Sequence, residues 1–519
     1  MHEHTEITIL RSSCMNCKKA CLVINPRDGQ NTAKLTAILP VFAAAGWETS
    51  IVLKEYPGHT MELGTQAAQQ DYDLVISFGG DGTLNQVVNG VMHDKKHKCI
   101  VGTIPGGTVN QWAEEVNVPS DPVKAALTLV SSDVRKVDIA QVEITSLEFL
   151  PTTQDGQQQA PSNDFHNPSN SKRKVKSSPD ARHNFLLMAG LGIDAAVMEH
   201  VNKSLKHRIG VAAVGLTTIE KLPEQHVFPI EIWETGEGDD SEKRWKGKAL
   251  QVIIGNTRRY AGAIEMTSDA FIDDGMLDVC VVTAGEPLST LQQVTSILLR
   301  RKSDNQASEY FRGAHLSMRV PASIALQVDG STVELKDYLS KSDRKALQHA
   351  ENAEHVMVTY QFDALPKALK VAIPSTYDDT LFEKTKHTES QEENQQTPEQ
   401  AESDSDTSQK PSTTSTNKQQ PSSEQLDSLV KDGRKVTVIA VSPRAIKDQT
   451  YIVAGTTIKQ STGEVRPVAI RIKEDTTLLK RTGECVDVAK VRELQENTEI
   501  IVEGKKNKRG VINATRLVI

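Results

Sequence analysis

Apolar residues in the first 135 positions alternate between short continuous runs and runs with helical spacing. The continuous runs predict buried strands at 20–24, 51–53, 74–78 and 100–104. The spacing i, i+3, i+4, i+7 predicts helices at 35–42, 84–91 and 123–130. Strands that alternate with helices indicate a parallel sheet covered by helices, which is an α/β fold.

Between residues 137 and 362 the pattern changes to one that is mostly strands. We expect them at 137–144, 184–188, 227–232, 249–254, 277–282, 324–328 and 356–360. The pattern predicts a mainly antiparallel β domain with a few helices. Its most apolar helical stretch, Ile209–Leu222, fits a core helix or the lining of a slot for an acyl chain.

Two stretches, 151–182 and 383–432, are so rich in polar residues and proline that we expect them to be disordered, as an inserted loop and a linker. The last segment alternates Val, Ile and Thr with Gly turns and resembles small OB-like β-barrels. The predicted organisation is a tail (1–18), an α/β domain (19–136), a β-rich domain (137–365), a connecting segment (366–382), the linker (383–432) and a small all-β domain (433–519).

Composition and charge exclude several classes of protein. The chain has 519 residues, a formal charge of −8 and 4% aromatic residues. No apolar run approaches the roughly 20 residues that cross a bilayer, and the first residues do not resemble a secretory signal. Mild acidity argues against a general nucleic-acid coat protein. We therefore expect a cytoplasmic protein.

Three of the six cysteines lie close together near the N-terminus. Cys14, Cys17 and Cys21 have the spacing C-x2-C-x3-C, and His2 or His4 could supply a fourth zinc ligand. Reduced thiols without a metal are the more ordinary interpretation.

The strongest local motif is Phe78-Gly-Gly-Asp-Gly-Thr-Leu-Asn85, where a buried strand runs through three glycines into a helix. Glycine lets backbone N–H groups approach an anion, and a helix N-terminus carries about half a positive charge. This arrangement is typical of a phosphate-binding loop. Asp81 fits if Mg²⁺ lies between it and the phosphates. A glycine turn with an Asp cap is the alternative.

A second loop, Ile104-Pro-Gly-Gly-Thr-Val-Asn110, also follows a strand and precedes a helical segment. The carboxyl ends of neighbouring parallel strands are where open α/β sheets bind ligands. We therefore expect the two loops to face one anionic ligand together.

With these motifs the sequence resembles the diacylglycerol kinase catalytic-domain family, which includes bacterial soluble lipid kinases and is related to sphingosine and ceramide kinases. The resemblance spans about residues 19–362. It rests on Asn25-Pro26…Gly29, the two glycine loops, Asn184…Gly190-Leu-Gly-Ile-Asp-Ala195, Asp273-Asp-Gly-Met-Leu-Asp278 and Val328-Asp-Gly330.

The resemblance implies a two-domain lipid kinase that binds ATP and Mg²⁺ between its domains. It assigns the nucleotide to Asn25, Gly79, Gly80, Asp81, Gly82, Thr83, Leu84, Asn85, Gly106, Thr108 and Asn110. Asp81 would join the catalytic magnesium network, and Asp329 would be the general base. A structural magnesium site would use the Asp274 side chain with the backbone at Phe271 and Met276. The family usually has Glu after Asp-Gly, where this chain has Ser331.

The expected activity is transfer of the γ-phosphoryl group of ATP to diacylglycerol or a similar lipid alcohol. The alternatives are an NAD kinase-like enzyme, which shares the first glycine loop, and a nucleotide- or lipid-binding regulatory protein with a lapsed active site. The resemblance also implies peripheral contact with a membrane. We do not expect a nucleic-acid partner, and a homo-oligomer is left open.

Overall fold

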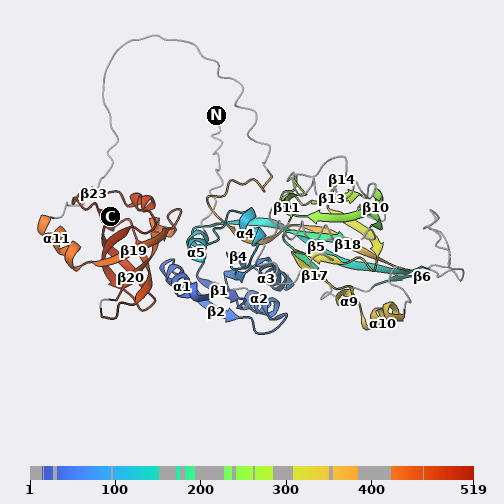
Figure 1. The fold of residues 1–519 in the computed structure, drawn as a ribbon, viewed down its shortest axis with the longest axis horizontal. Helices are drawn as coiled ribbons and strands as arrows, with labels where there is room; N and C mark the ends of the chain where they lie inside the picture. Colours follow the sequence, from blue (N-terminus) through green and yellow to red (C-terminus); the bar gives the residue numbers. More distant parts are fainter. Residues whose placement is uncertain are drawn as a thin grey trace, which may run out of the picture.

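The computed structural model describes residues 15, 17–26, 32–94, 98–150, 171–175, 182–192, 227–236, 241–260, 264–283, 308–349, 355–383, 422–459 and 461–519. These residues form three bodies in a row, a barrel, a central α/β domain and a β-rich domain (Figure 1). We call the α/β and β-rich bodies the first and second domains.

The first domain contains the parallel sheet that the sequence predicts. Its strands lie in the order β2–β1–β3–β4, and all three pairings are parallel. Their bounds are β1 Lys19–Ile24, β2 Glu48–Leu53, β3 Leu74–Gly79 and β4 Ile100–Pro105. The four predicted strands are therefore confirmed.

Helices cover both faces of this sheet. On one face lie α1 (Leu35–Ala44), after a short 3-10 turn at Thr32–Lys34, and α5 (Pro122–Val130). On the other face lie α2 (His59–Gln69) and α3 (Asp81–His93), while the short α4 (Gln111–Glu115) follows β4. The three predicted helices are present as α1, α3 and α5.

Two long strands join the first domain to the second. β5 (Asp133–Phe149) and β18 (Val356–Ile373) pair antiparallel, and the last part of β18 pairs in parallel with β4. The predicted connecting segment 366–382 is thus wrong in its first half, because residues 366–373 complete β18. Beyond it, Tyr377, Leu381 and Phe382 are buried in the core. Their apolar side chains anchor this segment in a core cluster that residues of both domains share.

The second domain is an antiparallel extension of the same sheet around its own core. Its elements are β6 Ser171–Lys174, β7 His183–Phe185, β8 Met188–Gly192, β9 Phe228–Thr235, β10 Ser241–Gly255, β11 Arg259–Tyr260, β12 Ile264–Glu265, β13 Leu277–Thr283, β14 Ser308–Gly313, β15 His315–Pro321, β16 Leu326–Val328, β17 Ser331–Val333, α9 Leu335–Tyr338 and α10 Lys341–His349.

Two expectations for this domain concern residues that the structure describes only in part or not at all. The apolar stretch 209–222 lies outside them entirely. Within the expected loop 151–182, residues 171–174 form β6, which pairs with β5. The loop prediction is therefore wrong for this part, where backbone pairing with an adjacent strand provides the order.

The C-terminal body is a closed five-stranded barrel in the order β19–β20–β21–β25–β24–β19. Its elements are α11 Ser423–Asp432, β19 Arg434–Val441, a 3-10 turn Lys447–Gln449, β20 Tyr451–Ile458, β21 Val465–Ile472, β22 Thr477–Leu479, β23 Cys485–Val486, a 3-10 helix Val488–Glu493, β24 Glu499–Lys506 and β25 Val511–Val518. The predicted small barrel is confirmed.

The linker ends earlier than the predicted residue 432, because α11 is helical. Ser422 and Gln425 form a reciprocal capping box at its start. Leu429 then packs against Ile501 of the barrel. The Ser-x-x-Gln motif was the sequence signal for this helix start.

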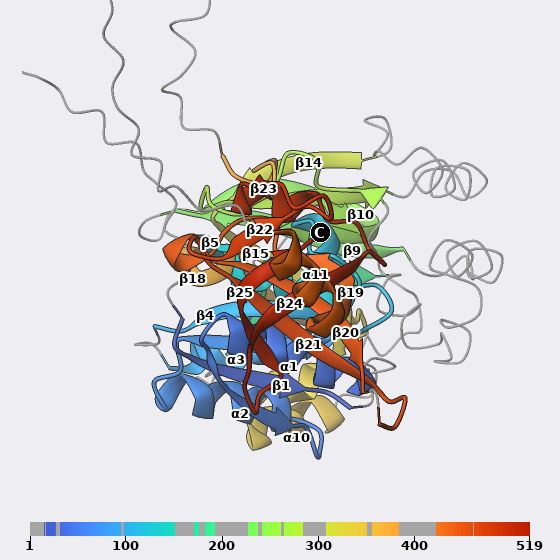
Figure 2. The ribbon, with the colours of Figure 1, turned by 90° about the vertical axis from the view of Figure 1, so that its left-hand side faces the viewer.

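The barrel packs directly on the first domain, in front of it in Figure 2. Ile452, Ala454, Ala469 and Val511 belong to the same apolar cluster as residues of α1 and α5. The Arg471 Nε donates to the Ala44 carbonyl at 2.8 Å, and the Arg444 Nε donates to the Ser131 carbonyl at 2.8 Å. The β20–β21 face of the barrel is therefore covered by the chain itself.

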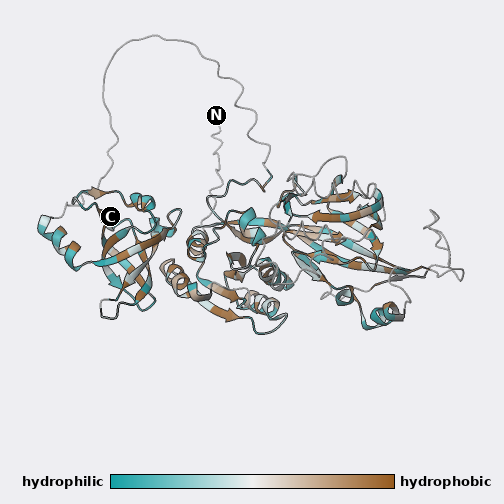
Figure 3. Cartoon of the chain, viewed as in Figure 1, coloured by the Kyte–Doolittle hydropathy of each residue, from teal (hydrophilic) through white to brown (hydrophobic). Residues whose placement is uncertain are grey.

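Most residues of the outer helices α10 and α11 are hydrophilic, as the hydropathy colouring shows (Figure 3). Among the described residues, no helix combines the length and apolar character required to cross a membrane.

Candidate active site

The two glycine loops of the first domain touch each other. The Gly106 N–H donates to the Gly79 carbonyl at 2.9 Å. A Cβ atom at Gly107 would lie 2.5 Å from the Gly80 Cα, which leaves no room for any side chain. The loops meet at the carboxyl ends of β3 and β4, which are neighbours in the sheet. Glycine at these positions is what allows the close approach.

The first loop leads directly into the N-terminus of α3. The N–H groups of Thr83 and Leu84 both donate to the Gly80 carbonyl, at 2.9 and 3.1 Å. The helical residues before them, Asp81 and Gly82, have no preceding turn to accept their N–H groups. These amides and the helix dipole form a site suited to phosphate. Asn25 lies beside it, with its Nδ2 3.4 Å from the Thr83 Oγ1.

Asp81 connects the two loops through the start of α4. Its Oδ2 accepts from the Gln111 N–H at 2.8 Å, and its Oδ1 accepts from the Trp112 N–H at 3.1 Å. Burial raises the pKa of Asp81, and these backbone donors oppose the rise. The Asp81 N–H is a third donor to this carboxylate, which leaves about one of its roughly four lone-pair positions open. Asp81 therefore fits a magnesium ion shared with phosphate, and it also supports the loop fold.

The second loop is held in shape by Asn110. Its Oδ1 accepts from the Gly107 N–H and its Nδ2 donates to the Gly107 carbonyl, both at 2.9 Å. Asn110 has a left-handed backbone with φ of 54°. Its side chain is thus engaged within the loop, whereas Thr108 is exposed and accessible to a ligand.

Asp329 lies at the boundary of the two domains, in the two-residue turn between β16 and β17. Asp329 and Gly330 both have positive φ, at 44° and 77°, as this tight hairpin requires. The Asp329 carboxylate is buried and accepts four hydrogen bonds of 2.9–3.0 Å. The donors are the Asn85 Nδ2 and the N–H groups of Leu186, Leu187 and Met188.

These contacts bear on the expected role of Asp329 as a general base. Burial raises its pKa to about 6, although the four donors act in the opposite direction. A carboxylate has about four lone-pair positions, so all of them are used here. Asp329 is arranged to hold the domains together, and it can accept a proton only if one donor leaves.

Polar groups on α3 reach the second domain at two further places. Asn85 and Asn89 both donate to the Asn184 carbonyl, at 2.9 and 2.8 Å, and the Asn89 Oδ1 accepts from the Asn184 N–H. A Cβ atom at Gly82 would lie 3.7 Å from the Ser331 hydroxyl. The turn that carries Asp329 therefore faces the first glycine loop. The sequence analysis did not single out Asn89, whose only signal is its spacing of four from Asn85.

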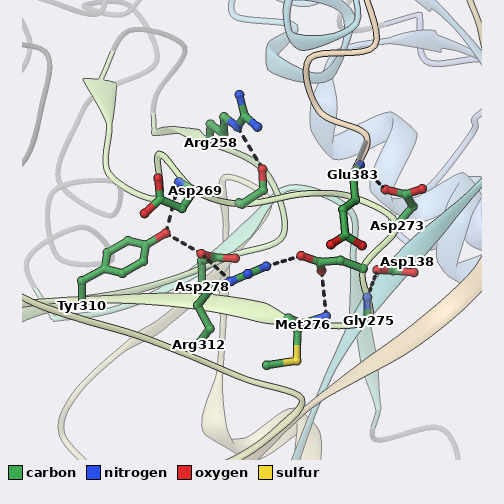
Figure 4. Close-up of polar contacts among 12 residues, drawn as sticks. Asp138, Arg258, Asp269, Asp273, Gly275, Met276, Asp278, Tyr310, Arg312 and Glu383 are labelled. Atoms are coloured by element: carbon green, nitrogen blue, oxygen red, sulfur yellow. Dashed lines mark hydrogen bonds and ion pairs between the residues drawn. The ribbon is translucent and has the colours of Figure 1, made fainter. Parts of the chain in front are cut away.

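The predicted structural magnesium ligand Asp274 has other partners in this structure, and two of them, Met276 and Arg312, are labelled in Figure 4. Its Oδ1 accepts from the Met276 N–H at 3.0 Å, and its Oδ2 is ion-paired with Arg312. Arg312 also pairs with Asp278 at 3.1 Å. The Phe271 ring stacks against the Arg258 guanidinium.

This arrangement does not fit the expected magnesium ion, because a guanidinium already occupies the Asp274 carboxylate. No group of three or more His, Cys, Asp or Glu side chains with metal-site geometry occurs in the described part of the chain. Burial raises the pKa of Asp278 to about 6, and Arg312 opposes the rise. The Asp138 carboxylate accepts from the N–H groups of Gly275 and Lys367, both at 2.6 Å. The Tyr310 hydroxyl donates to the Asp278 carboxylate, and, like Asp138 and Arg312, Tyr310 gave no signal in the sequence.

Of the predicted cysteine cluster, Cys17 and Cys21 are buried free thiols. Burial raises the pKa of Cys17 to about 12 and that of Cys21 to about 11, so both stay protonated. Cys14 and Gly29 lie outside the described residues.

Comparison with known proteins finds two domain families along the chain. Residues 19–142 match the diacylglycerol kinase catalytic domain, and residues 188–371 match the YegS C-terminal NAD kinase beta sandwich-like domain. The barrel lies outside both matched ranges.

Individual relatives and a solved structure are also similar to this chain. Two proteins named diacylglycerol kinase, from Bacillus subtilis and Staphylococcus saprophyticus, are 26% and 27% identical over 316 residues. Each match covers 60% of this chain, and 89% or 88% of the relative. A crystal structure of a diacylglycerol kinase from Bacillus anthracis matches with a TM-score of 0.48 at 20% identity, over 70% of this chain and 99% of that one.

Proposed function

We propose that this chain, which carries the catalytic domain of the diacylglycerol kinase family, transfers the γ-phosphoryl group of ATP to the hydroxyl of diacylglycerol or a similar lipid alcohol. That the chain is a lipid kinase follows from the matched domain and from the relatives. The proposal adds the phosphoryl donor, the metal and the acceptor.

The proposal rests mainly on one observation, the close contact between Gly80 and Gly107 at the N-terminus of α3. Phosphoryl transfer requires mainly that the phosphates are positioned and their charge is neutralised. The amides of the two loops and the hydroxyls of Thr83 and Thr108 supply neutral donors for a polyphosphate. Asn25 borders the same place.

We assign a magnesium ion to the phosphates and Asp81. Magnesium is usually held by one or two carboxylates together with substrate phosphates, and when bound it neutralises phosphate charge. Asp81 is the acidic side chain inside the first loop, and its three backbone donors leave about one of its roughly four lone-pair positions for a metal.

The acceptor hydroxyl would approach from the second domain, where Ser331 faces Gly82. In this proposal Asp329 fixes the turn and α3 relative to each other and accepts the proton from the lipid only after one of its four donors moves away. A raised pKa near 6 makes it a better proton acceptor than an exposed Asp.

An NAD kinase-like activity is the second candidate, because the matched second domain is described as NAD kinase beta sandwich-like. A shared sandwich indicates a shared fold and leaves the acceptor open. A regulatory protein with a lapsed active site is the third, and Ser331 in place of the family's Glu is the feature that favours it.

The test incubates the full chain with γ-labelled ATP, Mg²⁺ and separate acceptors: diacylglycerol in detergent micelles, a total lipid extract and NAD. We expect label in the organic phase, as a phosphorylated lipid identified by mass spectrometry. Label found only in NADP would replace the proposal with the second candidate. ATP binding without label in any product would favour the third.

A further inference from the structure

Large apolar side chains are exposed at several places on the molecule. The described residues contain seven of them, Ile51, Leu53, Tyr56, Val227, Val430, Ile458 and Val465. The two most exposed, Ile458 at 65% and Val465 at 60%, lie opposite each other at the tip of the β20–β21 hairpin. Lys459 and Arg466 are their exposed neighbours in sequence. Such a pair contributes nothing to the barrel core.

A second hairpin tip, between β24 and β25, lies beside β21. The Ala469 N–H donates to the Gly510 carbonyl at 3.1 Å, and a Cβ atom at Gly510 would lie 3.7 Å from the Pro467 carbonyl oxygen. This tip carries exposed cations at Lys505, Lys506, Lys508 and Arg509. Burial and the guanidinium groups of Arg434 and Arg466 lower the pKa of Lys506. Cations from three strand ends are therefore close neighbours.

We call the two hairpin ends, together with Arg434 at the start of β19, the tip surface, and we define it by its residues. They are Arg434, Ile458, Lys459, Val465, Arg466, Lys505, Lys506, Lys508 and Arg509. Glu464 is the acidic neighbour within the first hairpin and pairs with Arg466 at 2.7 Å. The surface combines an apolar pair with a clear excess of positive charge.

Contacts with α1 determine which way the tip surface faces. Pro40 lies beside Gly510, while Ala44 lies beside Arg471, so α1 and β21 run in the same direction. A helix rises about 1.5 Å per residue and a strand about 3.3 Å, which puts Val465 level with about the first turn of α1. That turn follows the carboxyl end of β1. The tip surface therefore extends toward the sheet edge that carries the glycine loops.

The edge strand β2 adds apolar surface on the same face of the sheet. Ile51 and Leu53 pair in register with Leu22 and Ile24, which belong to the α1 side of the core. Ile51 is 42% exposed and Leu53 is 51% exposed. β2 is the edge strand of the sheet, so among the described residues no further strand lies beside these two side chains.

We infer that the tip surface binds the surface of an anionic lipid bilayer and thereby holds the glycine loops near a membrane-resident acceptor. Apolar side chains that enter the interface, surrounded by lysine and arginine, are the chemistry that such a surface attracts. The excess of cations favours this occupant over a second copy of the chain. Although the net charge of the chain is −8, the matching surface of a second copy would be equally positive and would repel the first. The purpose of this binding rests on the proposed function, whereas the binding itself does not.

The experiment measures co-sedimentation of the full chain with vesicles of phosphatidylcholine alone or with phosphatidylglycerol, without nucleotide. Wild type should bind the anionic vesicles and release them as salt rises, because a Debye length of about 10 Å at 0.1 M screens such contacts. The double variant Ile458→Ser, Val465→Ser should bind the anionic vesicles more weakly by a factor of about ten or more, since two exposed apolar side chains are lost. Lys506→Glu with Arg509→Glu should weaken binding by a similar factor at low salt.

Matched controls lie elsewhere on the chain. Val227→Ser removes an exposed apolar side chain from the second domain, and Lys480→Glu reverses a charge in the turn after β22. Both should bind vesicles as wild type does. Equal binding by the Ile458, Val465 double variant, or no binding by wild type, would overturn the inference. So would a wild-type dimer that this double variant dissociates, because the partner would then be a second copy.

Kinase assays separate this inference from the proposed function. If both hold, the double variant loses activity on vesicle-embedded diacylglycerol but keeps its activity on diacylglycerol in detergent micelles. If the proposed function is wrong, wild type is inactive in both assays while its vesicle binding still decides the question of the tip surface.

Discussion

The Asn85 amide of α3 donates a 2.9 Å hydrogen bond to the buried Asp329 carboxylate of the second domain. The same amide donates to the Asn184 carbonyl, so one side chain links the helix to two segments of the other domain. Asn85 also belongs to the helix that begins at the first glycine loop. The position of that loop relative to the second domain thus depends on this contact.

Replacing Asn85 should therefore reduce both activity and stability. In Asn85→Ala the Asp329 carboxylate and the Asn184 carbonyl each lose a donor, which should cost about 1–3 kcal/mol of unfolding free energy. We expect a fall in kcat larger than the rise in the KM for ATP, because the error is in the relative position of the domains. Chemical denaturation and steady-state kinetics measure the two effects. Gln86→Ala on the same helix is the control, since the Gln86 Oε1 has no hydrogen-bond partner among the residues that the structure describes.

The loop contact predicts a second effect, on nucleotide binding. In Gly107→Ala the new methyl group would meet the Gly80 Cα at 2.5 Å, so the two loops must separate. ATP affinity measured by calorimetry should fall at least tenfold. Gly82→Ala serves as the folding comparison, because its Cβ would have 3.7 Å to its nearest neighbour. Unchanged ATP affinity in Gly107→Ala would remove the second loop from the nucleotide site.

The contacts of the candidate site differ in how far the sequence could predict them. The meeting of Gly80 and Gly107 follows from two glycine loops at adjacent parallel strand ends, and both signals are local. The capping of α4 by Asp81 depends on where the second loop turns, which no local pattern encodes. The same holds for Arg312. In the sequence it is one polar position of a strand, and only the pairing of β13 with β14 brings it next to Asp278. Periodicity predicts elements, whereas partners of buried polar groups are set by tertiary packing.

The ion cluster around Arg312 predicts a specific response to magnesium. Wild-type thermal stability should not depend on Mg²⁺ at this cluster, because the guanidinium balances Asp274 and Asp278. Arg312→Met leaves both buried carboxylates without a cation and should cost about 2–4 kcal/mol, slightly reduced by the partial exposure of Arg312. Added Mg²⁺ should then recover part of the loss, and Asp274→Asn in the same variant should abolish that recovery. A wild-type melting temperature that falls on chelation without nucleotide would contradict this account.

The raised pKa of Asp329 gives a pH dependence with a definite sign. Its folded-state pKa of about 6 exceeds its ordinary value of 3.8, so the folded chain binds more protons between these limits. Its contribution to stability is therefore largest below about pH 4 and is lost as pH rises through 6, a change of about 3 kcal/mol. Asp329→Asn has no such titration, so its unfolding free energy relative to wild type should increase across this range. Urea denaturation at pH 4, 5, 6 and 7 tests the sign, which would be reversed if the four donors outweighed burial.

The contacts of Arg471 predict that the barrel stays attached after the linker is cut. Arg471 donates from the barrel to the last carbonyls of α1, while an apolar cluster spans the same interface. A protease site inserted near residue 405 would allow the linker to be cleaved, and we expect the two wild-type fragments to co-elute in gel filtration. Arg471→Ala leaves the α1 carbonyls facing the barrel without their donor and should promote dissociation of the fragments. Lys124→Ala is the matched control, because the Lys124–Glu496 ion pair across the same interface is exposed and worth about 0–1 kcal/mol. Wild-type fragments that separate on cleavage would show that the interface is too weak to fix the tip surface relative to the first domain.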